Sequence, residues 1–151
     1  MYTLTKKIRF ETAHRIGLEY CGKCENPHGH SWRGKVTISG KSLNPQGMLM
    51  DFSELKQYIK PLEILLDHST LLHAGDHELI ELYRRKQWST IVFEENPTSE
   101  VVARMIFHYL IPLLPSHIQM ESVQIDETCN SECLYTRENH EGLKPVIWRQ
   151  L

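Results

Sequence analysis

Two segments near the N-terminus alternate apolar and polar side chains with a period of two. The apolar set lies at even positions: Tyr2, Leu4, Ile8 and Phe10 in the first segment, and Trp32, Gly34, Val36 and Ile38 in the second. Lys6 is the exception. Successive side chains of a β-strand point to opposite faces, so this pattern predicts two strands that each bury one face. A sheet with one buried and one open face follows.

The same parity places three histidines on the buried face, just beyond the apolar stripes. His14 continues the first segment, and His28 and His30 precede the second. A bulge between Phe10 and His14 would break this phase. Three imidazoles with one open position are the ligand set of a catalytic zinc. Cys24 lies four residues before His28 and supplies a reactive thiol nearby, so the pattern predicts metal-assisted chemistry on a small molecule.

The middle of the chain changes from a period of two to a helical period. Asp51 opens a helix whose apolar positions are Leu55, Tyr58, Ile59, Leu62, Leu65 and Leu66. Pro61 is expected to kink this helix or to split it. Thr98 is the expected N-cap of a second helix, with Glu100 in its first turn.

Strands return after the second helix, at Ser122–Glu127, Cys133–Arg137 and Val146–Trp148. The element order β-β-α-α-β-β predicts an α+β domain. We expect an antiparallel four-stranded sheet with two helices on one face, and one domain over residues 1–151, because no repeat or linker interrupts the chain.

Charge and hydropathy exclude some classes of function. The net charge is −2, and no apolar run approaches the ~18 residues that cross a bilayer. The N-terminus lacks the apolar core of a signal peptide, so a cytoplasmic protein is expected. Residues 1–41 carry eight Lys/Arg against three Glu. That excess suits a phosphorylated ligand, or simply the solvent faces of strands. A basic patch with interleaved aromatics is absent, which disfavours nucleic-acid binding.

Four cysteines allow a rival interpretation. They form the pairs Cys21-x2-Cys24 and Cys129-x3-Cys133. Such pairs can build a non-catalytic structural zinc site or disulfides, although disulfides are rare in cytosolic chains. An all-cysteine zinc site would leave the three histidines without a function, and its second pair has an unusual spacing. It is kept as the alternative binding module.

Asp67 and His68 are adjacent between the two expected helices. A capping Asp beside a surface His is the ordinary explanation of such a pair. The pair matters for chemistry only if the fold brings His68 near Cys24. An imidazole oriented by a carboxylate could then activate the thiol.

Six segments together resemble the family of 6-pyruvoyl-tetrahydropterin and 6-carboxytetrahydropterin synthases, which have the tunnelling fold (T-fold). These segments are Phe10–His14, Cys24–His30, Met50–Phe52, Leu66–His68, Asn96–Glu100 and Glu127–Thr128. They occur in the family's order and span nearly the whole chain.

The resemblance implies a role for nine residues. The implied Zn²⁺ ligands are His14, His28 and His30. The implied catalytic residues are Cys24 with the partner pair Asp67 and His68. The implied substrate contacts are Glu127, which would anchor the pterin ring, with Thr98 and Ser99 helping. A carboxylate suits that task because its two oxygens can accept paired N–H bonds.

The spacing from Cys24 to His28 and the run Glu127–Tyr135 are similar to the bacterial 6-carboxytetrahydropterin synthases of the queuosine pathway. The implied reaction converts 7,8-dihydroneopterin triphosphate to 6-carboxytetrahydropterin, acetaldehyde and triphosphate. The alternative within the family is 6-pyruvoyl-tetrahydropterin synthase.

The resemblance also implies a homo-oligomer. The expected form is a hexamer of two trimers with active sites at the subunit boundaries. Residues 69–95 are longer than in the shortest members, and Leu79, Leu82 and Tyr83 have the spacing of an extra helix.

Overall fold

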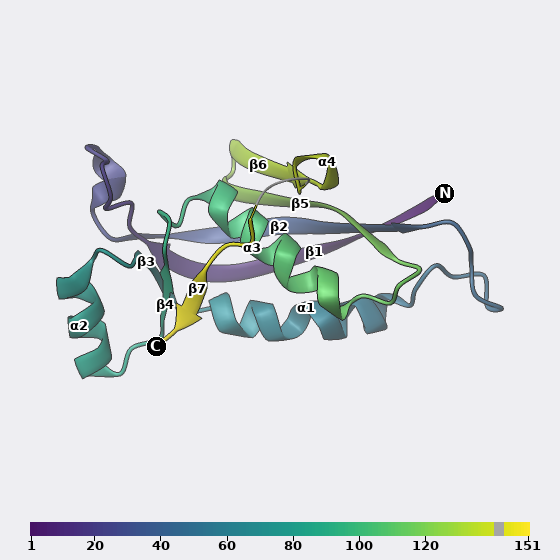
Figure 1. Ribbon diagram of the computed structural model, residues 1–151, viewed down its shortest axis with the longest axis horizontal. Helices are drawn as coiled ribbons and strands as arrows, with labels where there is room; N and C mark the ends of the chain where they lie inside the picture. Colours follow the sequence, from purple (N-terminus) through teal and green to yellow (C-terminus); the bar gives the residue numbers. More distant parts are fainter. Residues whose placement is uncertain (141–143) are drawn as a thin grey trace.

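A computed structural model describes residues 1–140 and 144–151 (Figure 1). Its strands are β1 (Tyr2–His14), β2 (His28–Gly40), β3 (Thr70–His73), β4 (Thr90–Phe93), β5 (Gln119–Thr128), β6 (Ser131–Thr136) and β7 (Trp148–Gln150). Its helices are α1 (Phe52–Leu66), α2 (His77–Lys86), α3 (Ser99–Leu110) and α4 (Arg137–His140). Two short 3₁₀ helices are η1 (Lys23–Glu25) and η2 (Ile111–Leu113).

The two N-terminal strands form a long antiparallel pair in the predicted phase. Their register is continuous from Tyr2 opposite Gly40 to His14 opposite His28. No bulge interrupts β1 between Phe10 and His14, so the even-numbered parity reaches the histidine. Ile8, Phe10 and His14 are all buried, as the alternation predicted.

The sheet is larger than predicted. It has seven strands in the order β6-β5-β2-β1-β3-β4-β7, so the expectation of four strands was wrong. The additional strands β3 and β4 come from residues 69–95, and the strand predicted at Val146–Trp148 is observed as β7, at Trp148–Gln150. β3 pairs in parallel with β1 and with β4, so the expectation of a wholly antiparallel sheet was also wrong. The α+β class is confirmed.

Helices α1 and α3 pack on the face of the sheet that carries the even-numbered side chains of β1 and β2, and this face holds the main core. That core joins Phe10, Trp32 and Val123 from the strands to apolar residues of both helices. Helix α2 packs elsewhere. Leu71 and Ile91 join the main core, whereas their neighbours Leu72 and Val92 pack with Ile80 of α2. Adjacent strand residues face opposite sides, so α2 covers the other face of β3 and β4. The expectation of two helices on one face therefore missed this one.

The predicted helix starts are confirmed. Asp51 is the N-cap of α1 and accepts from Ser53 N–H, while Thr98 is the N-cap of α3 and accepts from Val101 N–H. Pro61 does not split α1, which runs through it. The ring leaves the carbonyl of Gln57 without its usual donor, but that residue is exposed and water can serve it. Across the described residues, no helix is long and apolar enough to cross a membrane.

Candidate metal centre

Three imidazoles and one carboxylate converge where β1, β2 and β5 meet. His14 and His28 face each other across the strand pair, and His30 lies two residues further along β2. One ligating atom from each of these histidines and from Glu127 lies within 4.8 Å of the others. The predicted zinc ligands are therefore brought together by strand register alone.

The hydrogen bonds of the rings fix which nitrogens carry protons. His14 Nδ1 lies 2.9 Å from the carbonyl oxygen of Pro97, and His28 Nδ1 lies 2.7 Å from that of Asn26. A carbonyl oxygen only accepts, so both Nδ1 atoms donate a proton. In the neutral rings the Nε2 atoms then carry lone pairs, yet these two atoms lie only 3.1 Å apart. Backbone carbonyls that hold Nδ1–H in this way are typical partners of metal-binding histidines.

His30 completes the donor set. Its Nε2 is buried and makes no hydrogen bond to the described residues. Burial lowers the pKa of His30 first, and His14 and His28 lower it further, while Glu127 acts in the opposite direction. The neutral ring that a metal requires is thereby favoured. Three convergent Nε2 lone pairs, one of them buried and without a hydrogen bond to the described residues, fit Zn²⁺.

Glu127 extends from the end of β5 over the histidines. Its Oε1 lies 3.0 Å from His14 Nε2 and 3.4 Å from His30 Nε2. Contact with the His14 ring is the main cause of a pKa of Glu127 below its ordinary value, and the other two rings add to this against the effect of burial. The carboxylate is therefore ionised at neutral pH. It faces the histidines of its own chain.

The Trp32 side chain packs against the rings of His14 and His30. It is fully buried, stacks on Phe10 and donates its Nε1–H to the carbonyl of Thr12 at 2.9 Å. The rings of His14 and His30 meet it edge to face, with centroids 5.1 and 5.7 Å away. A rigid aromatic wall limits the rotamers of both ligands, and its truncation would cost about 3–5 kcal/mol.

A cavity of about 830 Å³ opens beside the histidines. It is lined by the start of β2 and by the β5–β6 hairpin, including His30, Arg33 and Glu127. This volume lies within the range of small-molecule sites. A ligand in the cavity would contact a candidate metal ligand, a carboxylate and a cation together.

Cys24 lies in η1, on the loop that joins β1 to β2. Its side chain is partly buried, and its carbonyl accepts from Ile16 N–H at 2.9 Å. A hydrogen bond to Cys24 raises the pKa of the Tyr20 hydroxyl. Cys24 does not belong to the metal-binding group in the described residues. The structure therefore provides a thiol on the loop that leads into His28.

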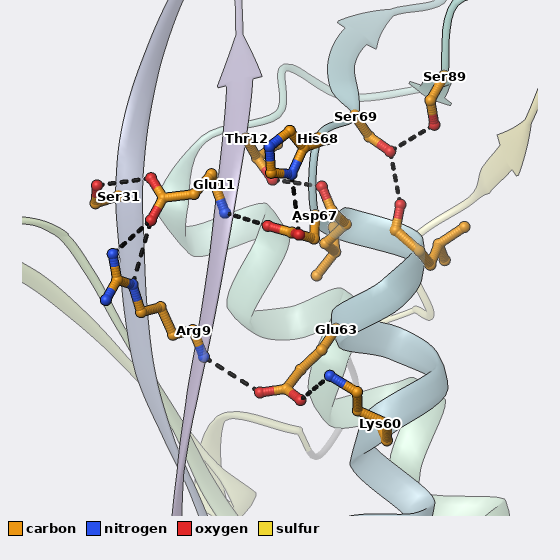
Figure 2. Close-up of polar contacts among 12 residues, drawn as sticks. Arg9, Glu11, Thr12, Ser31, Lys60, Glu63, Asp67, His68, Ser69 and Ser89 are labelled. Atoms are coloured by element: carbon orange, nitrogen blue, oxygen red, sulfur yellow. Dashed lines mark hydrogen bonds and ion pairs between the residues drawn. The ribbon is translucent and has the colours of Figure 1, made fainter.

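Asp67 and His68 form an oriented pair at the end of α1 (Figure 2). Asp67 accepts from Glu11 N–H at 2.8 Å and from His68 Nδ1 at 2.9 Å. The hydrogen bond from Glu11 is the main cause of the lowered pKa of Asp67, and that from His68 adds to it. The His68 side chain is 81% exposed and its backbone φ is +59°. In the part of the chain described, no polar contact of this pair reaches Cys24.

The segment Asn96–Thr98 holds both the loop after β1 and the His14 ring, which the residue pattern did not predict. The Asn96 amide accepts from Gly17 N–H and Leu18 N–H and donates to the Leu18 carbonyl, while the Pro97 carbonyl holds His14. Thr98 caps α3, and neither it nor Ser99 lines the cavity beside the histidines. A ligand histidine needs a fixed acceptor for its Nδ1–H, but a backbone carbonyl in this role cannot be recognised from residue type.

The cysteines do not form the alternative site. All four are free, and Cys21 and Cys129 are exposed. Over residues 1–140 and 144–151, the histidine–Glu127 group is the one that could hold a metal ion. The arrangement therefore disfavours the structural zinc module.

Comparison with known proteins identifies relatives along most of the chain. The sequence profile of the 6-pyruvoyl tetrahydropterin synthase family matches residues 3–138. The 6-carboxy-5,6,7,8-tetrahydropterin synthase of Synechocystis sp. is 35% identical over 141 residues, covering 89% of this chain and 93% of that protein. The protein of the same name from Haemophilus influenzae is 30% identical, covering 89% and 99%.

Solved structures share the fold. The 6-pyruvoyl tetrahydropterin synthase of Caenorhabditis elegans superposes with a TM-score of 0.67 at 26% identity, covering 89% of this chain and 94% of that one. An uncharacterised protein from Wolinella succinogenes gives a TM-score of 0.71 at 20% identity, covering 90% and 98%. The second match shows the fold alone.

Proposed function

The chain belongs to the 6-pyruvoyl tetrahydropterin synthase family, and we propose that it makes 6-carboxytetrahydropterin from 7,8-dihydroneopterin triphosphate, releasing acetaldehyde and triphosphate. The observation that carries this proposal is the convergence of three histidine Nε2 atoms beside a cavity lined by Glu127. Relatives named 6-carboxy-5,6,7,8-tetrahydropterin synthase support the carboxy product. The place of this reaction would be queuosine biosynthesis in the cytoplasm.

His14, His28 and His30 would hold Zn²⁺. Bound there, the ion would supply Lewis acidity toward the side-chain hydroxyls of the substrate. The protein's contribution is to fix the three rings in position. The carbonyls of Pro97 and Asn26 hold two of the rings through Nδ1, and Trp32 packs against His14 and His30.

Glu127 would bind the pterin ring. Its lowered pKa keeps it ionised, so both oxygens can accept hydrogen bonds from the 2-amino group and ring N3 of a pterin. Arg33 lies in the same cavity and offers a positive charge to the triphosphate. Thr98 and Ser99 would assist from the start of α3, next to the carbonyl that holds His14.

Cys24 would take a proton from the substrate side chain, and Asp67 with His68 would control its charge. His68 donates Nδ1–H to Asp67, so in the neutral ring Nε2 is left as a base that points away from the carboxylate. Because this pair makes no polar contact with Cys24 of its own chain, we propose that it serves the Cys24 of a neighbouring subunit. A homohexamer of two trimers would bring the residues together.

A second candidate is 6-pyruvoyl-tetrahydropterin synthase, which eliminates triphosphate without cleaving a carbon–carbon bond. The family profile and the C. elegans structure carry that name. Incubation of the zinc-loaded protein with 7,8-dihydroneopterin triphosphate, followed by mass analysis, separates the two. We expect 6-carboxytetrahydropterin and acetaldehyde in equal amounts. A pyruvoyl product without acetaldehyde would support the second candidate, and unchanged substrate would refute both.

A further inference from the structure

The loop of residues 15–27 carries Cys24 and is tied down at its beginning by Arg15. Arg15 Nε–H donates to the carbonyl of Glu25 at 2.6 Å, one residue beyond the thiol. Ile16 N–H donates to the carbonyl of Cys24 itself at 2.9 Å. The two bonds hold the backbone directly after the Cys24 side chain, at the Cys24 carbonyl and at the next one. The position of Arg15 therefore helps to set the position of the thiol.

Arg15 is in turn held by Asp76. Arg15 Nη1 and Asp76 Oδ1 form an ion pair, in which the Arg15 side chain is 22% exposed and the Asp76 side chain 8% exposed. Asp76 lies at the start of α2, within residues 69–95. Figure 1 shows the loop and α2 at the same end of the molecule. Helix α2 is thus joined to the loop that carries the thiol.

The Asp76 side chain binds Arg15 and does not cap its own helix, α2. An Asp at an N-cap ordinarily accepts hydrogen bonds from the first turn of its helix, but Asp76 makes no such bond. Its second oxygen, Oδ2, is buried and makes no hydrogen bond to any described residue. A buried carboxylate that is incompletely paired is costly. Sequences break local rules of this kind mainly where a function compensates.

Gly17 makes room for the pair. A Cβ on Gly17 would lie 2.6 Å from Asp76 Oδ1 and 3.0 Å from Arg15 Nη1. The first contact is shorter than real Cβ atoms make and the second is tight, so a side chain at residue 17 would push the ion pair out of its present position. Close contacts at Gly17 therefore join the loop to the ion pair between Arg15 and α2.

We propose that the Arg15–Asp76 pair is a positioning device for Cys24, and that α2 of this chain acts on the reaction through it. Neither residue touches the metal ligands' donor atoms or the cavity beside the histidines. The proposal rests on the proposed function, in which Cys24 transfers a proton. Misplacement of a reacting group by about 1 Å can lower a rate by about 100-fold.

The test is Asp76→Asn, which preserves shape and removes the charge that holds Arg15. We expect kcat to fall by about 10-fold or more with KM changed by less than about 2-fold, because the loop holds a reacting group and not the substrate. Zinc content should remain that of the wild type. Alkylation of Cys24 by iodoacetamide, followed by peptide mass analysis, should become faster because the loosened loop exposes the partly buried thiol.

Three further variants sharpen the result. Glu81→Gln removes an exposed ion pair with Arg84 on the same helix and should leave kcat and alkylation unchanged. Arg15→Lys retains the charge but loses the Nε–H bond to Glu25, so it should give an intermediate loss of kcat. Gly17→Ala pushes the two side chains apart without removing either charge, so it should lower kcat and speed alkylation as Asp76→Asn does. It serves as the test if Asp76→Asn does not fold.

Wild-type kcat in both Asp76→Asn and Gly17→Ala would overturn the proposal. So would a fall in kcat with unchanged Cys24 alkylation, or a loss of zinc in parallel with activity, since each would indicate a general structural role. The alkylation measurement needs no substrate. Failure of the positioning role is therefore distinguishable from failure of the proposed reaction, which the products of the wild type decide.

Discussion

Proton positions on three imidazoles decide what this site can bind. Because His14 and His28 each donate Nδ1–H to a backbone carbonyl, their Nε2 atoms are fixed as acceptors that face one another. Two acceptors 3.1 Å apart are stabilised by a cation between them. His30 contributes a third, buried acceptor. The fitness of this group for a metal ion therefore depends on main-chain hydrogen bonds as much as on the histidines themselves.

The period-two parity predicted which histidines share a face, and strand register confirms it. The same parity could have predicted the position of Glu127, which continues the buried alternation of Val123 and Ile125 along β5. Glu127 lies 3.0 Å from His14 of its own chain. The carbonyls of Pro97 and Asn26 could not be assigned, since backbone acceptors leave no mark in residue type.

Cys24→Ala tests the residue that would transfer the proton. We expect zinc content and pterin affinity to remain within about 2-fold of the wild type while kcat falls by at least about 100-fold, because the thiol acts only in the chemical step. Isothermal titration with a non-reacting pterin and steady-state kinetics measure both. Cys21→Ala, in the same loop, is the matched control and should retain wild-type kcat. A Cys24→Ala protein that turns over normally would remove the thiol from the mechanism.

At the scale of elements, long alternating strands and capped helices were predictable, but short buried strands were not. β3 and β4 each have four residues, all of them buried, so they show no alternation. A short apolar run reads equally as a piece of helix or strand. Their places are set by parallel pairing with β1 and with each other, which is tertiary information. Helix α2 was predicted by the spacing of its apolar residues, but the face that it covers was not.

The start of α1 gives a prediction on pH. Hydrogen bonds from the Ser53 hydroxyl, and then from its backbone N–H, hold the pKa of Asp51 below its ordinary value. The pKa of Asp51 is therefore lower in the folded state than in the unfolded state, so the ionised carboxylate stabilises the fold at neutral pH. This stabilisation is lost as the pH falls below about 4, where the carboxylate becomes protonated. Asp51→Ala should lower the Tm at pH 7 by about 2–4 °C.

The matched variant is Asp51→Asn, which keeps an acceptor for the first turn of α1 without its charge. We expect it to retain most of the Tm at pH 7 and to lose less Tm than the wild type between pH 5 and about pH 3. Thermal unfolding followed by circular dichroism across this range measures the difference. Equal acid sensitivity of the wild type and Asp51→Asn would show that Asp51 contributes nothing to the pH dependence.

At the scale of the whole molecule, the single chain has open sheet edges, and its Asp67–His68 pair makes no polar contact with Cys24 among the described residues. β6 and β7 end the sheet, and Leu134 on β6 is exposed. Soluble proteins pair or protect such edges. The carboxylate-oriented His68 extends into solvent from the end of α1, away from any described contact with Cys24. Both features agree with the proposed oligomer, in which each site takes residues from two subunits.

Subunit mixing tests the shared site. Cys24→Ala and His68→Ala homo-oligomers should each be inactive. If the two residues of one site come from different chains, random reassembly at a 1:1 ratio should restore about a quarter of the wild-type rate per site. Mass spectrometry of the intact assembly confirms that mixed oligomers have formed. Mixed oligomers without activity would place both residues of a working site in the same chain.

The most direct test of the central claim is the location of zinc in crystals of this protein, measured by anomalous diffraction at the zinc edge. We predict one peak per subunit, bound by Nε2 of His14, His28 and His30 at about 2.0–2.1 Å. His28→Ala crystals should lack it. A zinc peak among Cys21, Cys24, Cys129 and Cys133, with the histidines empty, would contradict the account.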